Sequence, residues 1–88
     1  MYKIEYHKKA LKDIEKLKQN NLVTKAKNLI EVIKVNPFQN PPPYEKLLGD
    51  LKELYSRRIN IQHRLIYQVF EDKKLVRIIS LWSHYENI

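Results

Sequence analysis

The chain has 88 residues, of which 43% are hydrophobic, which is enough to pack one small domain and too many for a disordered chain. It contains no cysteine, which excludes a disulfide framework, a thiol nucleophile and a metal site built on cysteine. Seventeen Lys and Arg against ten Asp and Glu give a net charge of +7, and such a field attracts polyanions: nucleic acid, an anionic membrane surface or an acidic protein.

The chain shows no sign of a targeting or membrane segment. Its apolar runs, such as Ile78-Ile79 and Leu81-Trp82, are far too short to span a bilayer. Residues 1–6 alternate polar and apolar side chains and lack the apolar core of a signal peptide. We therefore expect a soluble cytoplasmic protein without a membrane partner.

The first part of the chain predicts a strand followed by two helices. Residues 2–6 alternate with the period of a half-buried strand. Residues 7–19 carry apolar side chains on one helical stripe, and we expect the lysines and Asp13 to lie outside it. A second amphipathic helix runs from Leu22 to Asn36-Pro37, where the proline stops it. The short connection favours an antiparallel helical hairpin laid on a sheet.

The second part of the chain predicts strands. Residues 36–46 form a loop that holds all four prolines. Strands are expected at 53–60, 63–70 and 74–84, where β-branched and aromatic residues are frequent, with a polar break at 71–74. The order β-α-α-β-β-β predicts a single α+β domain over residues 1–88, with an antiparallel sheet and the helical hairpin packed on one of its faces.

The predicted strands carry more charge than a purely structural sheet needs. Arg57, Arg58, His63 and Arg64 lie within the segment that should be best buried, and His84 lies near the end of the last strand. Arginine offers a planar fork that suits phosphate. One face of the sheet is therefore predicted to be a working surface for an anion, namely an RNA phosphate.

The residue types limit the chemistry. The three histidines are scattered without metal-ligand spacing, the single glycine excludes a phosphate-binding loop, and there is no G-x-S-x-G elbow. Acid–base chemistry by Arg, His, Glu and Tyr without a cofactor remains. That set suits RNA cleavage in which the 2′-hydroxyl is the nucleophile, because the protein then only moves protons and stabilises charge on the phosphate.

Two motifs carry a resemblance to a known family. The run from Tyr55 to Tyr67, Y-S-R-R-I-N-I-Q-H-R-L-I-Y, and the terminal Trp82-Ser83-His84-Tyr85 resemble the Txe/YoeB family of bacterial toxins. That family belongs to the RelE-like group of ribosome-dependent mRNA interferases. The similarity extends to Asn36-Pro37-Phe38 and Tyr44-Glu45 and so spans nearly the whole chain. It implies a RelE-like fold and an endoribonuclease that cleaves mRNA in the ribosomal A site.

The resemblance implies a role for each matching residue. Glu45 would be the general base or would orient the 2′-hydroxyl, and Arg64 would hold the scissile phosphate. His84 would be the general acid, with Tyr85 beside it against the substrate. No metal or cofactor is implied.

Three further basic residues are expected to contact RNA. Arg57 and Arg58 match the paired arginines of the family and are expected to make RNA or fold contacts, and Lys46 is expected to contact RNA beside Glu45. This chain has Gln62 where the family often has an acidic residue, which would leave Arg64 less neutralised. His63 is interpreted as structural, with a hydrogen bond to the backbone.

The family also implies partners. These are the ribosome with its mRNA and a cognate antitoxin of the YefM/Phd-like kind, whose disordered acidic segment wraps the basic surface. A homodimer is left open.

Without the resemblance, other interpretations stay open. Arg64 could simply pair with a carboxylate, Glu45 with its neighbour Lys46, and His84 could be an ordinary exposed side chain. As functions, a non-catalytic RNA- or ribosome-binding translation inhibitor and an enzyme for a small anionic substrate remain alternatives to the nuclease.

Overall fold

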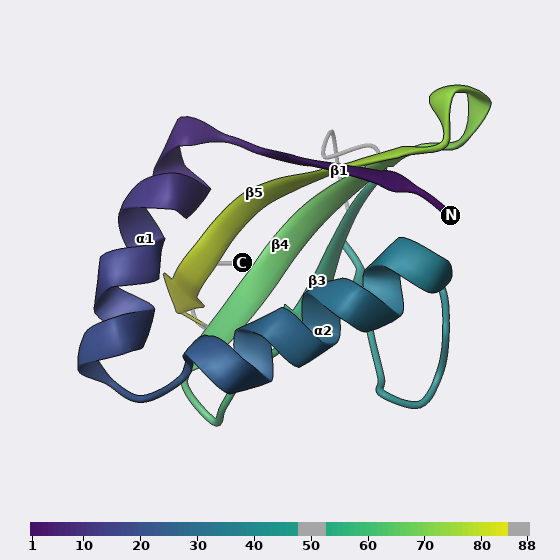
Figure 1. Ribbon diagram of the computed structural model, residues 1–88. Helices are drawn as coiled ribbons and strands as arrows, with labels where there is room; N and C mark the ends of the chain where they lie inside the picture. The colour runs from purple at the N-terminus through teal and green to yellow at the C-terminus, as the bar shows by residue number, and fades with distance from the viewer. Residues whose placement is uncertain (48–52, 85–88) are drawn as a thin grey trace.

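The computed structural model describes residues 1–47 and 53–84. Figure 1 shows the two helices and the sheet. The elements in chain order are β1 (Lys3–Tyr6), α1 (Lys8–Gln19), α2 (Val23–Val35), β2 (Glu45–Lys46), β3 (Leu54–Arg58), β4 (His63–Phe70), the 3-10 turn η1 (Glu71–Lys73) and β5 (Leu75–His84). The predicted order of strand, two helices and three strands is confirmed, and the short strand β2 is an addition within the predicted loop.

The strands form one five-stranded sheet in the order β1-β5-β4-β3-β2. The pairs β2–β3, β3–β4 and β4–β5 are antiparallel, whereas β1 runs parallel to β5. The α+β class is confirmed, but the prediction of a purely antiparallel sheet is wrong, since the sheet is mixed. An alternating strand pattern shows which side chains share a face and does not show the direction of the partner strand.

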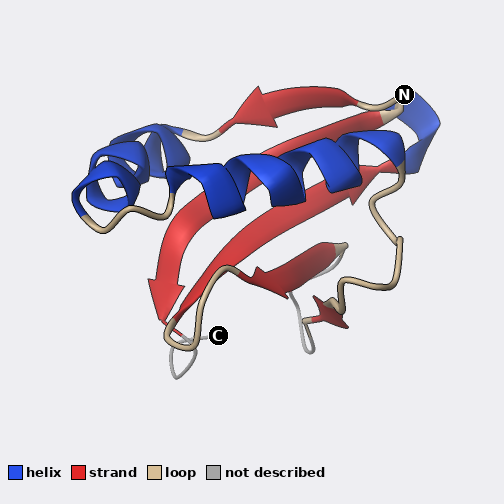
Figure 2. Cartoon of the chain, turned by 60° about the horizontal axis from the view of Figure 1, so that its bottom comes forward, coloured by secondary structure: helices blue, strands red, loops and turns tan. Residues whose placement is uncertain are grey.

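Both helices lie on the same face of the sheet (Figure 2). The core between them is apolar and is contributed by α1, α2, β4 and β5. Its fully buried members include Ala10, Leu17, Ala26, Ile33, Leu65, Tyr67, Val76 and Ile78. In β4, Leu65 and Tyr67 belong to this core, so the alternating residues Arg64 and Ile66 lie on the opposite face. Neither helix covers that face (Figure 2), and we call it the open face.

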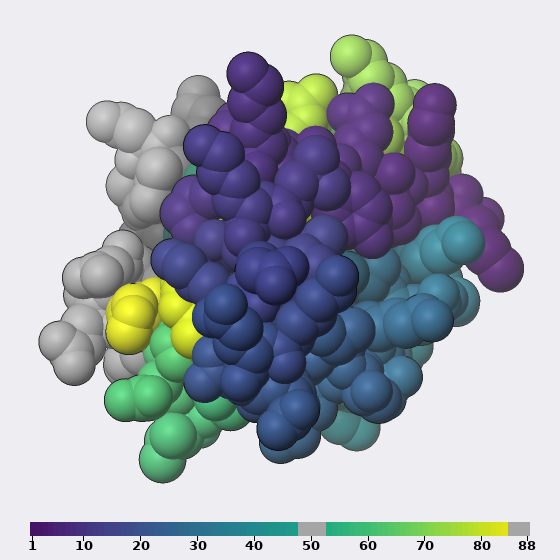
Figure 3. Space-filling model, turned by 60° about the vertical axis from the view of Figure 1, so that its left-hand side comes forward, coloured from purple at the N-terminus to yellow at the C-terminus, as the bar shows by residue number. Residues whose placement is uncertain are grey.

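Helix α1 lies beside β5, past the end of β1, because β1 pairs with β5 only as far as Ile78. Asp13 of α1 accepts hydrogen bonds there from the Leu81 amide at 3.1 Å and from the Ser80 hydroxyl at 3.2 Å, and it pairs with Lys9 at 2.8 Å. Asp13 is only 3% exposed, so the expectation that it lies outside the buried stripe is wrong. In Figure 3, α1 covers this side of the molecule, with the yellow end of β5 beside it.

No helix in the described ranges is both long and apolar enough to cross a membrane.

Candidate functional site

The predicted pair Glu45 and Arg64 meets on the open face of the sheet. Strand β2 places Glu45 opposite Ser56 of β3, and Ser56 lies opposite Ile66 of β4, so these side chains share the face that carries Arg64. Glu45 Oε1 lies 3.3 Å from Arg64 Nη2. The register of three adjacent strands therefore brings together two residues that are far apart in the sequence.

Arg64 is held in place by a hydrogen bond to the neighbouring strand β3. Its Nε donates to the Ser56 hydroxyl, a buried partner on the next strand. The Arg64 side chain is 4% exposed, whereas the Glu45 side chain is 61% exposed. The guanidinium is thus fixed by the sheet, and its carboxylate partner stands at the surface. An anion that reaches this pair would meet a cation that is already fixed in place. Beside it stands an exposed carboxylate that can accept a proton.

His84 lies on β5 at the same end of the sheet. Ser83 is the partner of Arg64 across the β4–β5 ladder, and His84 is the partner of His63, so Arg64 and His84 are one residue out of register on neighbouring strands. His84 is exposed. Its ring meets the His63 ring edge to face at 4.8 Å. Tyr85, the remaining residue predicted to be catalytic, lies outside the described residues.

His63 is a buried residue that packs at the same end of the sheet. It is 6% exposed and stacks on Trp82 with a centroid distance of 3.6 Å and an interplanar angle of 14°. Burial lowers the pKa of the His63 imidazole, and the neighbouring His84 lowers it further. Within residues 1–47 and 53–84 its Nδ1 has no hydrogen-bond partner. Ring stacking is therefore the contact that we see holding this histidine, in place of the predicted backbone hydrogen bond.

Arg57 does not belong to the surface. It is fully buried and lies on the helix-facing side of β3, opposite Leu65. Its guanidinium donates to the carbonyls of Pro37, Gln39 and Pro42 and to the Tyr67 hydroxyl. The predicted RNA contact is therefore wrong for Arg57, because its fork is occupied inside the protein. The alternative, a fold contact, is the one observed.

Arg58 and Lys46 remain on the surface. Both are exposed. Arg58 lies opposite Arg64 across the β3–β4 ladder and lines a pocket of about 260 Å³ together with Lys25 and Asn28 of α2. Lys46 follows Glu45 in β2. These two basic residues are close to the Glu45–Arg64 pair in the sheet. The alternation of β2, however, points Lys46 to the opposite face from Glu45, and Arg58 reaches the pocket beside α2.

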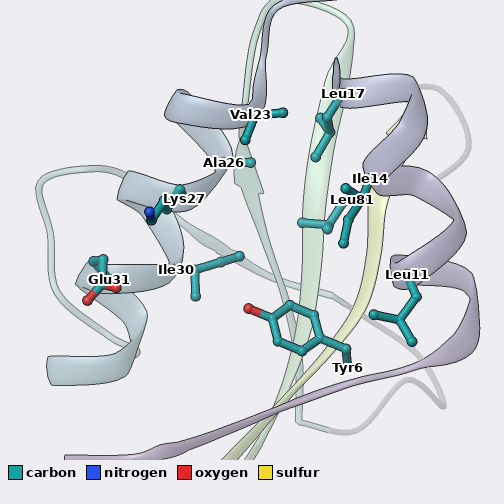
Figure 4. Close-up of a pocket in the computed structure, with 10 residues that line it drawn as sticks. All are labelled: Tyr6, Leu11, Ile14, Leu17, Val23, Ala26, Lys27, Ile30, Glu31 and Leu81. Carbon is teal, nitrogen blue, oxygen red and sulfur yellow. The ribbon is translucent and has the colours of Figure 1, made fainter. Parts of the chain in front are cut away.

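A second pocket also lies on the helix side of the sheet, between the two helices, β1 and β5. Its volume is about 310 Å³, and its lining is mostly apolar (Figure 4). Tyr6, Leu11 and Val23 at this pocket are large apolar side chains that remain exposed. Glu45, Arg64 and His84 are not among its lining residues. It is thus a separate surface feature, not part of the Glu45–Arg64 site.

Reasoning from the sequence missed two buried polar contacts, that of Ser56 with Arg64 in the candidate site and that of Asp13 with β5 in the fold. The alternation of β3 places Ser56 on the same face as Arg58 and hence as Arg64. Asp13 follows Ala10 by three residues and precedes Leu17 by four, which is the spacing of one helical face. Both signals were present in the residue spacing. Across the described ranges, no three His, Cys, Asp or Glu side chains gather as a metal site would require.

Comparison with known proteins identifies similar chains. A family described as the YoeB-like toxin of bacterial type II toxin–antitoxin systems matches residues 6–85. A toxin YoeB of Streptomyces coelicolor is 42% identical over 64 residues, which are 72% of this chain and 74% of that protein.

Two solved structures from Staphylococcus aureus have the same fold. One is a heterotetrameric YoeB–YefM toxin–antitoxin complex, with 33% identity, a TM-score of 0.78 and coverage of 97% of this chain and 99% of that chain. The other is a YoeB dimer, with 33% identity, a TM-score of 0.81 and coverage of 96% and 98%.

Proposed function

Because this chain belongs to the family of YoeB-like toxins of bacterial type II toxin–antitoxin systems, we propose that it is a ribosome-dependent endoribonuclease. In this proposal it cleaves mRNA in the ribosomal A site, in the cytoplasm, and thereby stops translation. The observation that carries the proposal is the Glu45–Arg64 ion pair on the open face of the sheet, with Arg64 anchored by Ser56.

The reaction would proceed by acid–base catalysis, with the 2′-hydroxyl of the substrate as nucleophile. Glu45 removes or orients the 2′ proton, so that the 2′ oxygen bonds to phosphorus. Arg64 donates to the non-bridging phosphate oxygens, where negative charge develops. His84 gives a proton to the departing 5′ oxygen as the P–O bond breaks. Each proton transfer is worth roughly 10²–10⁴-fold in rate, and the fixed cation contributes a comparable factor.

Each of these roles has support in the arrangement of the residues. Glu45 is exposed, as a group that must reach a substrate proton needs to be. The Arg64 side chain is 4% exposed, its guanidinium included, which restricts its motion and strengthens its interaction with an anion that reaches it. His84 is exposed at the end of β5, beside His63 and one position out of register with Arg64. Tyr85 would lie against the substrate, and Arg58 and Lys46 would bind the flanking RNA.

The partners follow from the same proposal. The net charge of +7 would draw the protein to ribosomal RNA, and the ribosome would present the codon. By analogy with the Staphylococcus aureus complex of YoeB with YefM, a cognate antitoxin of the YefM/Phd-like kind would neutralise the toxin. The YoeB dimer from the same organism supports a homodimer as the form of the free protein.

The experiment that tests the function is ribosome-bound mRNA cleavage, mapped at nucleotide resolution. Wild type should cut within the A-site codon only when the ribosome is present, and His84→Gln should lose the cuts. His7→Gln is the matched control, because His7 is an exposed residue whose Nδ1 accepts from the Lys9 amide at the start of α1. Translation arrest with intact mRNA in all three proteins would reject the nuclease and leave a ribosome-binding inhibitor.

A further inference from the structure

Arg57 and Tyr67 form one buried polar unit beneath the proline-rich loop. Arg57 Nη2 donates to the Pro37 carbonyl at 3.0 Å and to the Gln39 carbonyl at 2.9 Å, and Nη1 donates to the Pro42 carbonyl at 2.6 Å. Arg57 Nε donates to the Tyr67 hydroxyl at 3.1 Å, and that hydroxyl donates in turn to the Pro37 carbonyl at 2.7 Å. One guanidinium and one phenol thus bind carbonyls along the loop from its beginning to Pro42.

The same unit reaches the residue next to Glu45. The Tyr44 ring lies 5.1 Å from Arg57 Cζ, in the geometry of a cation–π contact. Tyr44 also meets the Tyr55 ring edge to face at 6.0 Å, and Phe38 meets Tyr55 at 5.2 Å. The short stretch that leads to Glu45 is therefore held at two points, at Pro42 by a hydrogen bond and at Tyr44 by its ring contacts.

We propose that Arg57 and Tyr67 are positioning residues that hold the loop from Pro37 to Pro42 in one conformation before substrate binds, and so place Glu45 opposite Arg64. This proposal rests on the proposed function only because it takes Glu45 to be a catalytic residue. The ordering of the loop is a separate property of the fold, and it is measurable without any reaction.

The physical argument is preorganisation. Glu45 stands on a two-residue strand at the edge of the sheet, so the strand alone gives it little support. A loop that is already ordered pays no entropy when the substrate arrives, and a reacting group that moves by about 1 Å can cost roughly 10²-fold in rate. Arginine suits this task because its planar fork can satisfy several carbonyls at once, which a lysine ammonium cannot do with the same geometry.

Hydrogen exchange of the free protein provides the first test. Tyr67→Phe removes the hydroxyl and keeps the ring, and Arg57→Lys keeps the charge and removes the fork. Val76→Ala is the control, because Val76 is fully buried but pairs with Ile4 and Val69, away from the loop. Amides of residues 38–40 and 44–47, which flank the three prolines, should exchange about tenfold or more faster in Tyr67→Phe and Arg57→Lys, and at the wild-type rate in Val76→Ala at equal distance from its melting temperature. Equal loop exchange in all four proteins would overturn the proposal.

Cleavage of ribosome-bound mRNA provides the second test. In Tyr67→Phe the maximal single-turnover rate should fall by about 10- to 100-fold, while the half-saturating concentration of ribosome complex stays unchanged. Faster loop exchange with an undiminished cleavage rate would overturn the positioning role. An equal loss in Val76→Ala would also overturn it, since the effect would then follow general stability. If wild type cleaves no RNA, the proposed function fails, and the exchange data alone decide whether this pair orders the loop.

Discussion

Glu45 and Arg64 form an ion pair of 3.3 Å across the β2–β3–β4 register, with the arginine inside the sheet and the glutamate at the surface. A second pair in the same protein, Glu5 and Arg77, has the same separation of 3.3 Å, but both of its partners are half exposed. The two pairs are alike in charge and distance and differ in burial and location. They therefore form a natural set of test and control for the proposed site.

The first prediction concerns Glu45→Gln. The variant keeps the shape of the side chain and removes its charge, so cleavage of ribosome-bound mRNA should fall by about 10²–10⁴-fold. Stability should change by about 1 kcal/mol, because Glu45 is largely exposed and the Gln amide oxygen can still accept a hydrogen bond from the buried Arg64 guanidinium. Single-turnover cleavage and thermal melts measure the two effects. Glu5→Gln should cleave like wild type, and equal activity of Glu45→Gln would exclude Glu45 from the chemistry.

The second prediction concerns Arg64→Lys. Lysine keeps the positive charge but cannot donate to Ser56 and to a phosphate from one rigid plane. The cleavage rate should fall by about 10²–10³-fold, as when a fixed transition-state donor is removed. The same assay applied to Arg77→Lys should show no loss. If both lysine variants cleave equally well, charge alone suffices and the fork geometry of Arg64 has no catalytic role.

The third prediction concerns the pH dependence of stability through Asp13. Burial by itself raises the pKa of this carboxyl, but hydrogen bonds from Lys9, the Leu81 amide and Ser80 outweigh it and hold the pKa below its ordinary value of 3.8. A carboxyl with a lowered pKa stabilises the fold above its unfolded pKa, and this contribution is lost as the pH falls through the folded pKa. Asp13→Asn should therefore cost about 1–3 kcal/mol at pH 7.

The difference between wild type and Asp13→Asn should shrink as the pH falls below 3.8, because the carboxyl of the unfolded chain takes up its proton there while the folded one, with its lowered pKa, does so only at lower pH. Urea unfolding at pH 3, 4, 5 and 7 measures it. A difference that stays constant over this range would show that the charge of Asp13 is not the source of the stabilisation.

The fourth prediction concerns His63→Phe. Because burial, together with His84, lowers the pKa of His63, the neutral ring stabilises the fold above the ordinary pKa of 6.5. That contribution is lost as the pH falls through the folded pKa. Phenylalanine can retain the stack on Trp82 without titrating. The free energy of unfolding should thus depend less on pH between 7.5 and 5 in the variant than in wild type.

The fluorescence of Trp82 offers an independent signal, since it is the only tryptophan and lies against the His63 ring. The emission of wild type should change as His63 gains its proton, and the change should be absent in His63→Phe. His7→Gln, which alters an exposed histidine, should leave the wild-type titration in place. A titration that persists in His63→Phe would assign it to another group.

The sequence by itself determined the order and approximate bounds of the helices and the long strands. It did so because the apolar spacing of α1 and α2, the stop at Asn36-Pro37 and the alternation in the strands are local properties of the chain. It also identified the family, because the Tyr55–Tyr67 run is continuous and distinctive. Glu45, Arg64 and His84 came from that resemblance, and their catalytic roles remain predictions.

Only the tertiary structure decided which of two adjacent arginines is internal. Alternation places Arg57 and Arg58 on opposite faces of β3, but it does not show which face is covered. Arg57 donates to the carbonyls of Pro37, Gln39 and Pro42. These residues lie beside β3 only in the folded chain. The parallel pairing of β1 with β5 has the same origin, and so has the partner of Asp13 on β5, since spacing places Asp13 on the buried face of α1 but does not show that it meets the Leu81 amide. Each depends on contacts between distant segments, which no local pattern encodes.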